Sequence, residues 1–385
     1  NSALSLRPRA ARGTGVLCIK AFRFRIVMMQ VARVIRVEAE PSIGIVKCAP
    51  RPGSVIHRRV GISHTTNPRV ELMAARAQQN GNIIQPTGAG SFLPAYTPYS
   101  SAPAQANQSF KASGKTVVIT GGSQGIGRAT ALLFAKKGFN VVVAARDVSK
   151  LEYVAHDCAQ IAGRAGASLA VQCDVTSERD VRNLANTVYA KFESVDVVVS
   201  SAGIISRGRL LDTPFAEAKR LMDVNYIGAY LLAQSFLPQM AKESQRRRGL
   251  DRPSIIMINS FAGKVPLKHM SAFTASKYAL AGFTEAIRTE AEPLGVHIGQ
   301  VYPGLVKSNF MERAEFFGSN KEEERRAFRQ QIRSLPFSQT PAEVADCVFD
   351  ASRTKQHNVV VGLPFMAADA AFRFTGANIS ALPFL

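Results

Sequence analysis

The stretch TVVITGGSQGIGRATALLFAKKG, residues 116–138, decides the fold of this 385-residue chain. It reads as a buried β-strand, a glycine-rich turn and a helix. Gly121, Gly125 and Gly127 follow the pattern G-x-x-x-G-x-G, which allows a tight turn and a close approach of the backbone to a phosphate. The free N–H groups of a helix that opens at Gly125 would then face a pyrophosphate. The stretch therefore predicts a dinucleotide-binding site.

Apolar runs alternate with segments of helical period through residues 111–365. Near-continuous apolar runs are typical of strands buried on both faces, as in a parallel sheet. The predicted strands are 116–120, 140–145, 168–175, 195–202, 254–259 and 296–303. Helical period and length predict helices at 125–137 and 271–292, among others. This alternation predicts one α/β domain with a doubly wound, Rossmann-type parallel sheet.

Residues 1–110 differ from the rest of the chain in charge. They hold 14 of the 48 Lys and Arg residues but only three of the 28 acidic residues, so over half of the net charge of +20 lies there. A sequence pI of about 10.1 would otherwise suggest nucleic acid as a partner. Because the excess is concentrated in this extension, we expect no nucleic-acid binding by the folded part.

The composition of the extension predicts a disordered, basic leader. Residues 81–110 carry no charge and are rich in Gly, Pro, Ser and Ala, a composition that cannot easily bury a core. Arg-rich, acid-poor leaders are typical of organelle transit peptides. We expect a plastid address, with the mitochondrion or the cytoplasm as alternatives. The other interpretation is an upstream region that precedes a true start at Met28, Met29 or Met73.

Cysteines and apolar runs argue against two further classes of protein. The five cysteines are scattered without a C-x-x-C pair or a Cys/His cluster, so we expect neither a disulfide framework nor a metal site. No uncharged apolar run reaches the ~18 residues that a membrane-spanning helix needs. The apolar tail at 366–385 is suited to cap the sheet, to join an oligomer interface or to touch a membrane surface.

The end of the second predicted strand bears on the choice of cofactor. A site that prefers NAD usually has an acid there for the ribose 2′-hydroxyl, whereas this chain has Ala145 followed by Arg146. A cation at Arg146 can pair with a 2′-phosphate, and the missing carboxylate avoids repelling it. We therefore expect NADP(H). An ordinary surface arginine after a strand is the structural alternative.

Several motifs together resemble the short-chain dehydrogenase/reductase family over residues 113–310. They are TGGSQGIG (120–127), CDVT (173–176), SSAG (200–203), MDVNYIG (222–228), INSFAG (258–263) and YPGLVKS (302–308). The resemblance implies a homodimer or homotetramer built on two long helices that start near Asn225 and Ser271. It also implies a set of cofactor-binding residues, which are Thr120, Gly121, Ser123, Gln124, Gly125, Ile126, Gly127, Arg146, Asp174, Val175, Ser201, Ala202, Gly203, Lys277, Pro303, Gly304, Val306 and Ser308.

One of the family's four catalytic residues, which are Asn, Ser, Tyr and Lys, is replaced in this chain. The motifs place Asn225 and Ser260 at two of these positions. In the family the tyrosine follows the serine by 13 residues and the lysine comes four residues later, which falls on Phe273 and Lys277. Residues four apart share a helix face, so Lys277 should lie beside residue 273. No tyrosine in the chain has a lysine four residues later, so the loss is not a shift of register.

Phenylalanine keeps the ring but removes the proton donor, which leaves two functions open. The first is an NADP(H)-dependent oxidoreductase that reduces a small apolar carbonyl or enone, lipid-like in character. Its proton would come from a water relayed through Asn225 and Lys277, or from His269 four residues before Phe273. The second is an NADP(H)-binding pseudoenzyme with a regulatory or scaffolding role.

The charged segment at 309–335 resembles the mobile lid that sets substrate specificity in the family. Its apolar residues suggest either a lining for an apolar substrate or an ordinary hydrophobic helix face. These residues are Phe310, Met311, Phe316 and Phe317.

Overall fold

The computed structural model describes residues 114–248, 251–308, 310, 312–334 and 338–375. The predicted disordered extension at 1–110 lies outside the described residues, and so do the last ten residues of the predicted tail. The described residues make up the α/β domain.

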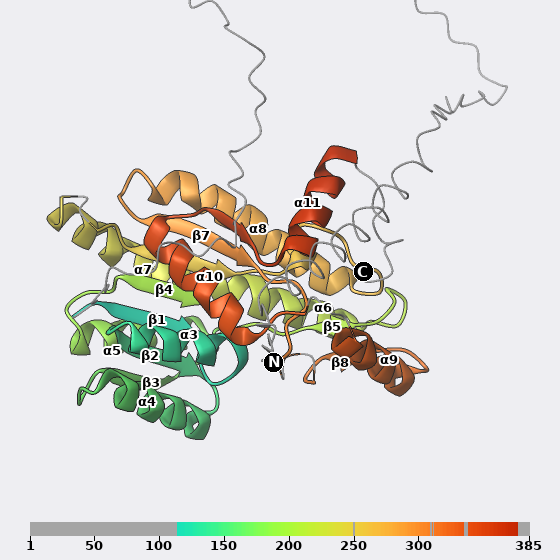
Figure 1. The fold of residues 1–385 in the computed structure, drawn as a ribbon, viewed down its shortest axis with the longest axis horizontal. Helices are drawn as coiled ribbons and strands as arrows, with labels where there is room; N and C mark the ends of the chain where they lie inside the picture. Colours follow the sequence, from blue (N-terminus) through green and yellow to red (C-terminus); the bar gives the residue numbers. More distant parts are fainter. Residues whose placement is uncertain (1–113, 249–250, 309, 311, 335–337, 376–385) are drawn as a thin grey trace, which may run out of the picture. The chain divides into compact units, whose positions relative to one another are not determined.

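Seven parallel strands form the central sheet (Figure 1). They are β1 Thr116–Thr120, β2 Asn140–Ala145, β3 Ser168–Gln172, β4 Val197–Ser200, β6 Ser254–Ile258, β7 His297–Tyr302 and β9 Asn358–Val360. Their order across the sheet is β3-β2-β1-β4-β6-β7-β9. The chain moves outward from β1 to β3, returns beside β1 and then moves outward in the other direction. This order confirms the predicted doubly wound sheet and puts a switch point, where such folds bind ligands, between β1 and β4.

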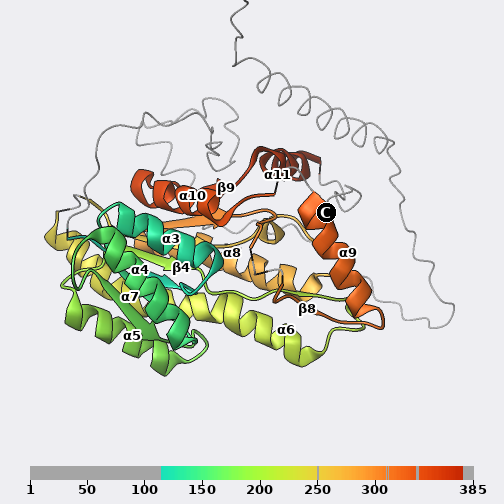
Figure 2. The ribbon, with the colours of Figure 1, turned by 60° about the horizontal axis from the view of Figure 1, so that its bottom comes forward.

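Helices cover both faces of the sheet (Figure 2). They include α3 Gly125–Lys136, α4 Val148–Ala162, α5 Glu178–Lys191, α7 Gly228–Arg246, α8 Ser271–Ala291 and α10 Pro341–Thr354. On one face, α3, α4 and α10 share a core with Val117 and Ile119 of β1. On the other face, α5, α7 and α8 share a core with Val118. Alternate residues of one strand therefore enter two cores, which explains why its sequence is apolar without a break.

Four predicted strands are longer than the strands observed, and two of them, at 168–175 and 195–202, exceed the observed strands by three and four residues. The runs at 168–175 and 195–202 end as strands at Gln172 and Ser200. The residues after these two ends form loops at the carboxyl edge of the sheet. Apolar character continued there because loops that border a cavity are also partly buried. The short strand β9 was not predicted, since three residues are too few for a clear pattern.

A small group of elements lies at the end of the domain toward which the strand arrows point (Figure 1). Ser206–Arg207 form β5 and Glu315–Phe316 form β8, and the two pair in parallel. Lys321–Ser334 form α9. The rings of Phe316 and Phe328 meet edge-on with 6.0 Å between their centroids. The predicted lid segment is therefore a short strand followed by a helix.

The last described helix, α11 (Leu363–Thr375), crosses the predicted domain boundary at residue 365. Phe365 and Ala368 are buried against Phe261 and Tyr302 at the carboxyl edge of the sheet. The described part of the predicted tail thus packs onto the domain. Among the helices of the described ranges, none combines the length and the apolar character that crossing a membrane requires.

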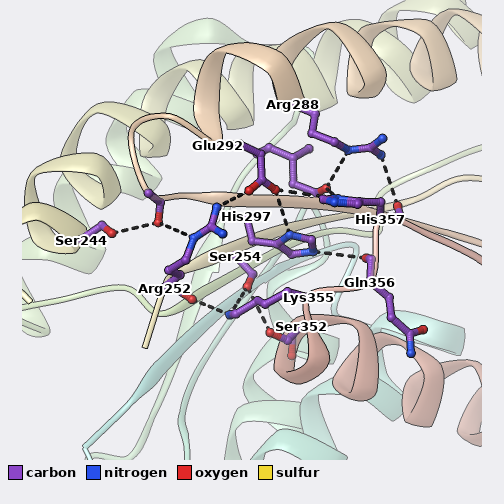
Figure 3. A network of polar contacts seen from close by, with 12 residues as sticks. Ser244, Arg252, Ser254, Arg288, Glu292, His297, Ser352, Lys355, Gln356 and His357 are labelled. Carbon is purple, nitrogen blue, oxygen red and sulfur yellow. Dashed lines mark hydrogen bonds and ion pairs between the residues drawn. The ribbon is translucent and has the colours of Figure 1, made fainter. Parts of the chain in front are cut away.

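A polar network joins the C-terminal end of α8 to β7 and to the turn before β9 (Figure 3). Fully buried His297 lies in it, with Nδ1 3.1 Å from Glu292 Oε1 and Nε2 3.2 Å from the Gln356 carbonyl oxygen. Arg252 pairs with the second carboxylate oxygen of Glu292. Burial lowers the pKa of His297 to about 4, although Glu292 pulls in the opposite direction. The imidazole is therefore neutral at pH 7, and the network holds structural elements together.

Candidate active site

A cavity of about 710 Å³ opens at the carboxyl ends of the strands. The loops after β1, β2, β3, β4, β6 and β7 contribute to its wall. Residues of α8 and the lid residues Phe310, Arg313 and Phe328 complete it. The cavity lies at the switch point of the sheet, where the glycine-rich stretch predicts a dinucleotide.

The stretch from the turn after β1 into the first turn of α3 has no room for a side chain at Gly121 or Gly127. Gly121 has a φ of +66°, and a Cβ there would lie 2.8 Å from the backbone of Ala202. A Cβ on Gly127 would lie 2.2 Å from the carbonyl oxygen of Gly121. The helix then starts at Gly125, and the side chain of the preceding Gln124 makes no capping hydrogen bond. The first N–H groups of α3 thus have no side-chain cap, and this cradle fits the pyrophosphate of a dinucleotide.

Thr120 is not among the described residues that line the cavity, and the cofactor contact that the resemblance implied for it stays a prediction. Its side chain is fully buried, and its hydroxyl oxygen accepts hydrogen bonds from the N–H groups of Ser201 (3.2 Å) and Ala202 (3.4 Å). Thr120 therefore holds the loop after β4 against the loop after β1. It positions cavity residues from behind.

Basic side chains gather where β2 ends. Arg146 and Lys150 line the cavity there, and the Lys150 ammonium is 2.6 Å from the carboxylate of Asp147. Arg313 of the lid segment also lines the cavity, and burial together with the charge of Arg146 lowers its pKa. Arg146 and Arg313 are therefore close enough to feel each other's charge. Two guanidinium groups in this place suit a ribose 2′-phosphate.

Asp174 and Val175 lie on the loop after β3 and line the cavity. The Asp174 carboxylate accepts hydrogen bonds from the backbone N–H (2.9 Å) and the hydroxyl (2.8 Å) of Thr176, which fixes the loop as a turn. A Cβ on Gly228 would lie 2.8 Å from the Val175 side chain. The glycine at the start of α7 therefore lets this loop approach the helix.

Asn225 lies in a π-helical turn, Asp223–Ile227, between α6 (Phe215–Met222) and α7. Its Oδ1 accepts a hydrogen bond from the Ile204 N–H at 2.9 Å. Its Nδ2 donates to the Ile204 carbonyl at 3.0 Å and to Ser276 Oγ at 2.9 Å. Both amide hydrogens are thus used within the protein, so the Asn225 side chain could hold a water only through Oδ1. Like Thr120, Asn225 lies behind the cavity wall.

Ser276 connects the π-helical turn to α8, the helix that carries Phe273 and Lys277. Ser276 was not identified from the sequence. It is fully buried in α8, accepts from Asn225 and donates through Oγ to the Phe273 carbonyl at 2.7 Å. The turn of α8 that carries positions 273 and 277 is therefore tied to the π-helical turn. The sequence signal was available, because residues three apart on a helix share a face.

Lys277 is buried, with 4% of its surface exposed, and its Nζ donates to the Ile258 carbonyl at 3.3 Å. Burial lowers the pKa of this ammonium to about 8. A Cβ on Gly203 would lie 3.7 Å from Lys277 Nζ and 3.3 Å from Asn225 Oδ1. Lys277 and Asn225 therefore approach the same point of the loop after β4, whose residues Ser201–Gly203 the resemblance assigns to the cofactor.

Ser260 follows β6 and caps the short 3-10 helix η2 (Phe261–Gly263). Its Oγ accepts a hydrogen bond from the Ala262 N–H at 3.2 Å, which leaves the hydroxyl hydrogen free to donate. A Cβ on Gly263 would lie 2.9 Å from the Lys277 carbonyl oxygen, so η2 lies directly against α8. Ser260 is thereby held close to the catalytic helix and can polarise a substrate oxygen.

Phe273, which the spacing from Ser260 predicts at the position of the family's tyrosine, lines the cavity and is 2% exposed. It belongs to an apolar cluster that includes Ile205, Met270 and Phe316. Among the described residues, no tyrosine lines the cavity. The ring is therefore kept as packing while the hydroxyl is missing.

His269, the alternative acid, is not among the described residues that line the cavity, whereas its neighbours Leu267 and Met270 are. Its backbone has a φ of +60°, and its carbonyl accepts a hydrogen bond from the Gly208 N–H at 2.8 Å. The geometry therefore gives His269 no support as the proton donor.

The Pro-Gly stretch after β7 is held by a buried glutamine and by α11. The Gly304 N–H donates to Gln339 Oε1 at 3.1 Å. A Cβ on Gly304 would lie 2.1 Å from the ring of Phe365, so only glycine lets this ring close over the loop. The sequence pattern of α11 gave no sign of this contact.

Most of the predicted site residues come together in this one cavity. Those that line it are Gly121, Ser123, Gln124, Gly125, Ile126, Gly127, Arg146, Asp174, Val175, Ser201, Ala202, Gly203, Ser260, Phe273, Lys277, Pro303, Gly304, Val306 and Ser308. Arg207, Arg313 and Phe328 also line it without having been predicted. They come from β5 and the lid, which carry no motif.

The doubly wound sheet, the glycine cradle and the buried lysine beside it define a nicotinamide-dependent oxidoreductase fold. A family model described as short chain dehydrogenase matches residues 115–316, and the chain belongs to this family. Its members are oxidoreductases that bind nicotinamide cofactors, act on small molecules and often form oligomers.

Relatives and solved structures agree with this assignment. The chain is 29% identical over 252 residues to dehydrogenase/reductase SDR family member 7B of Danio rerio. The alignment covers 64% of this chain and 77% of the relative. It is similar to the solved structure of a short-chain type dehydrogenase/reductase from Mycobacterium marinum, with 26% identity and a TM-score of 0.56. The match covers 71% of this chain and 98% of that chain. An alcohol dehydrogenase from Thermococcus sibiricus, solved with 5-hydroxy-NADP, shares the fold at 24% identity, a TM-score of 0.53 and coverage of 64% and 96%.

Proposed function

We propose that this protein is an NADP(H)-dependent oxidoreductase that reduces an apolar carbonyl or enone with a proton source other than tyrosine. The observation that carries the proposal is the hydrogen-bonded arrangement of the other predicted site residues around Phe273. Asn225, Ser276 and the Lys277 turn of α8 remain joined by hydrogen bonds, and Ser260 keeps a hydroxyl hydrogen to donate. A frame of this kind still orients a substrate and polarises its oxygen.

A bound NADPH supplies the hydride. Ser260 donates a hydrogen bond to the substrate oxygen, and the Lys277 ammonium holds the ribose and adds positive charge where an oxyanion develops. The apolar cluster that contains Phe273 and Met270 excludes water and favours an apolar substrate. Reduction of an enone depends least on the lost phenol, because there the proton goes to carbon.

The proton comes from water or from Lys277 itself. Because burial lowers the pKa of Lys277 to about 8, this ammonium releases a proton far more readily than an exposed lysine. A water between Lys277 and the substrate oxygen would pass that proton on. His269 is the weaker alternative, since it does not line the cavity in the described part of the chain.

Support for NADP(H) over NAD(H) comes from the end of β2. Ala145 offers no carboxylate to a ribose 2′-hydroxyl, while Arg146 and Arg313 both line the cavity there. Burial, together with the charge of Arg146, lowers the pKa of Arg313, and a bound phosphate would offset this unfavourable accumulation of positive charge.

The direct test is to titrate the protein with NADPH and to follow NADPH fluorescence, and then to add a panel of apolar ketones, aldehydes and enones. We expect NADPH to bind and at least one compound to be reduced. NADPH binding without consumption by any member of the panel would overturn the reductase.

The pseudoenzyme with a regulatory or scaffolding role is the second candidate, and one observation favours it. Phe273 is packed as a core residue with 2% exposure, so the site is stable without a proton donor. A protein that binds NADPH, consumes none with the whole panel and gains activity only as Phe273→Tyr would be this pseudoenzyme.

Localisation and assembly are further proposals. On composition, residues 1–110 carry a plastid address, with the mitochondrion or the cytoplasm as alternatives. Fusion of these residues to a fluorescent protein tests this, and diffuse cytosolic fluorescence would overturn it. A homodimer or homotetramer through α7 and α8 is tested by light scattering. Peripheral membrane contact through the tail at 366–385 is tested by sedimentation with vesicles.

A further inference from the structure

Arg207 is a cation set into the apolar part of the cavity wall. It is the second residue of β5 and lines the cavity together with Ile205, Leu267 and Phe328. Its guanidinium carbon lies 4.8 Å from the centroid of the Phe328 ring. Burial lowers its pKa, but an arginine remains charged in a protein. This apolar wall therefore contains a fixed positive charge that water only partly solvates.

The protein uses little of the hydrogen-bonding capacity of this group. Arg207 Nη1 donates to the Lys268 carbonyl at 3.4 Å. Its Nε is 3.9 Å from Glu324 Oε2, which is beyond hydrogen-bond distance, and that oxygen is buried without a hydrogen-bond partner. Glu324 is not among the described residues that line the cavity. Because a guanidinium has five N–H donors, most of the Arg207 fork remains available to a ligand.

Two further cations that line the cavity, Lys219 and Arg220, are paired with acids three or four residues away. Arg220 donates to both carboxylate oxygens of Glu217 at 2.7 and 3.0 Å. Lys219 is 2.6 Å from the carboxylate of Asp223. Arg207 differs from both, because its nearest acid lies on α9 and makes no hydrogen bond with it.

We propose that Arg207 binds an anionic group, a carboxylate or a phosphate, at one end of the apolar substrate. The proposal rests on the proposed function and names its substrate class: an apolar ketone or enone that carries an anion. The cluster around Phe273 receives the hydrocarbon, and the planar fork of Arg207 receives two oxygens of the anion. A substrate that carries an amine would be repelled at this position.

The test measures binding, so it does not depend on turnover. Full-length protein saturated with NADPH is titrated by calorimetry with decanoate, decyl phosphate, decanol and decylamine. We expect at least one of the two anions to bind at least about tenfold more tightly than decanol, because one charge-assisted hydrogen-bonded pair contributes about that much affinity. The two anion arms show whether the site takes a carboxylate, a phosphate or both.

Arg207→Met keeps apolar bulk and removes the charge, so the preference for the anion should disappear while decanol binding stays. Arg207→Lys keeps the charge without the fork and should retain part of the preference. Lys268→Met is the matched control, because it removes an exposed cation from the neighbouring loop and should change nothing. NADPH affinity and thermal unfolding of each variant verify the fold.

The outcomes separate this proposal from the proposed function. Equal binding of anions and decanol by the wild-type protein, or an anion preference that survives in Arg207→Met, overturns the role of Arg207. If anions bind through Arg207 but no ketone consumes NADPH, the anion site stands and the reductase fails. If neutral ketones are reduced and no anion is preferred, the reductase stands and the anion site fails.

Discussion

The two walls of the cavity are built from different parts of the chain. The cofactor wall is formed by residues 121–127, 201–203 and 303–304. Backbone atoms leave no room for a Cβ at Gly121 or Gly127, and the Phe365 ring leaves none at Gly304. The substrate wall is formed by side chains, and its residues are Ile205, Arg207, Leu267, Met270, Phe273, Phe310 and Phe328. A backbone wall fails as a whole when one atom is added. A side-chain wall can lose one oxygen and remain packed.

On the proposed function, that difference would explain how an ordered site can lack its proton donor. The Phe273 ring is packed in an apolar cluster, so this position needs no hydroxyl to be filled. Ser276 still bonds the Phe273 carbonyl, and Lys277 still approaches Gly203. We therefore expect cofactor binding and catalytic activity to be separable, and the two walls to respond differently to substitution.

The largest effect is expected on the substrate wall. Phe273→Tyr returns a hydroxyl to the helix face that carries Lys277, and a positioned acid is worth roughly 10²–10⁴ in rate. We expect kcat for a carbonyl substrate to rise by about 10², with a smaller gain for an enone. Steady-state NADPH oxidation measures both.

Phe310→Tyr serves as the matched control for this substitution. It also adds a phenol to the cavity lining, but on the lid rather than on α8. It should give no gain. If Phe273→Tyr fails to accelerate a substrate that the wild-type protein reduces, another donor already occupies the role of the phenol.

On the cofactor wall, Gly127→Ala is the smallest addition of atoms that should break the site. Its Cβ would lie 2.2 Å from the Gly121 carbonyl oxygen, so the cradle must shift. Overpacking typically costs about 1–3 kcal/mol, and where the cradle bears that strain NADPH affinity should fall about fivefold to 150-fold. Fluorescence titration measures it.

Gly282→Ala is the control for that prediction, because a Cβ at this position in α8 meets no atom within 4 Å. It should leave NADPH affinity unchanged and the fold at least as stable, since alanine favours a helix over glycine. If the NADPH affinity of Gly127→Ala stays within threefold of the wild type, the cradle can accommodate a Cβ at this position and the prediction is wrong.

The two walls also differ in how far the sequence could predict them. The apolar strand pattern and the glycine turn each have few physical interpretations, so the sheet and the shape of the turn could be predicted, whereas the missing phenol stays a prediction from the spacing of Phe273 and Lys277. A motif does not say which way a side chain faces, and Thr120 and Asn225 lie behind the wall. The role of Arg207 depends on its distance from a glutamate 117 positions away in sequence, which no local pattern encodes.

An intermediate effect is expected from pH, through Lys277. Burial lowers its pKa to about 8, so the group is cationic below pH 8 and neutral above it. If the charge holds the ribose and assists the substrate oxygen, kcat/KM should be level below pH 8. It should then fall about tenfold for each further pH unit, because kcat/KM reports ionisations of the free enzyme.

Lys277→Arg separates charge from proton supply in this profile. Arginine stays cationic from pH 7 to pH 10. If the role of Lys277 is purely electrostatic, kcat/KM of the variant should be lower than that of the wild type but should not change with pH. If Lys277 also supplies the proton, the variant should lose activity at every pH. A wild-type profile without a break between pH 7 and pH 10 would contradict the assignment.

The smallest effect is expected at the rim of the cofactor wall. Arg146 is exposed, so its pairing with a 2′-phosphate is partly screened by water and should contribute only about tenfold. Arg146→Ala should therefore weaken NADPH by about that factor and leave NADH unchanged. Arg164→Ala, which removes an exposed arginine that bonds the Gly138 carbonyl at 2.9 Å, should alter neither affinity. Equal losses for the two cofactors would mean that Arg146 contacts the part they share. If Arg313→Ala also lowers the NADPH-to-NADH preference, then the lid of the substrate wall senses which cofactor is bound, and the two walls are coupled after all.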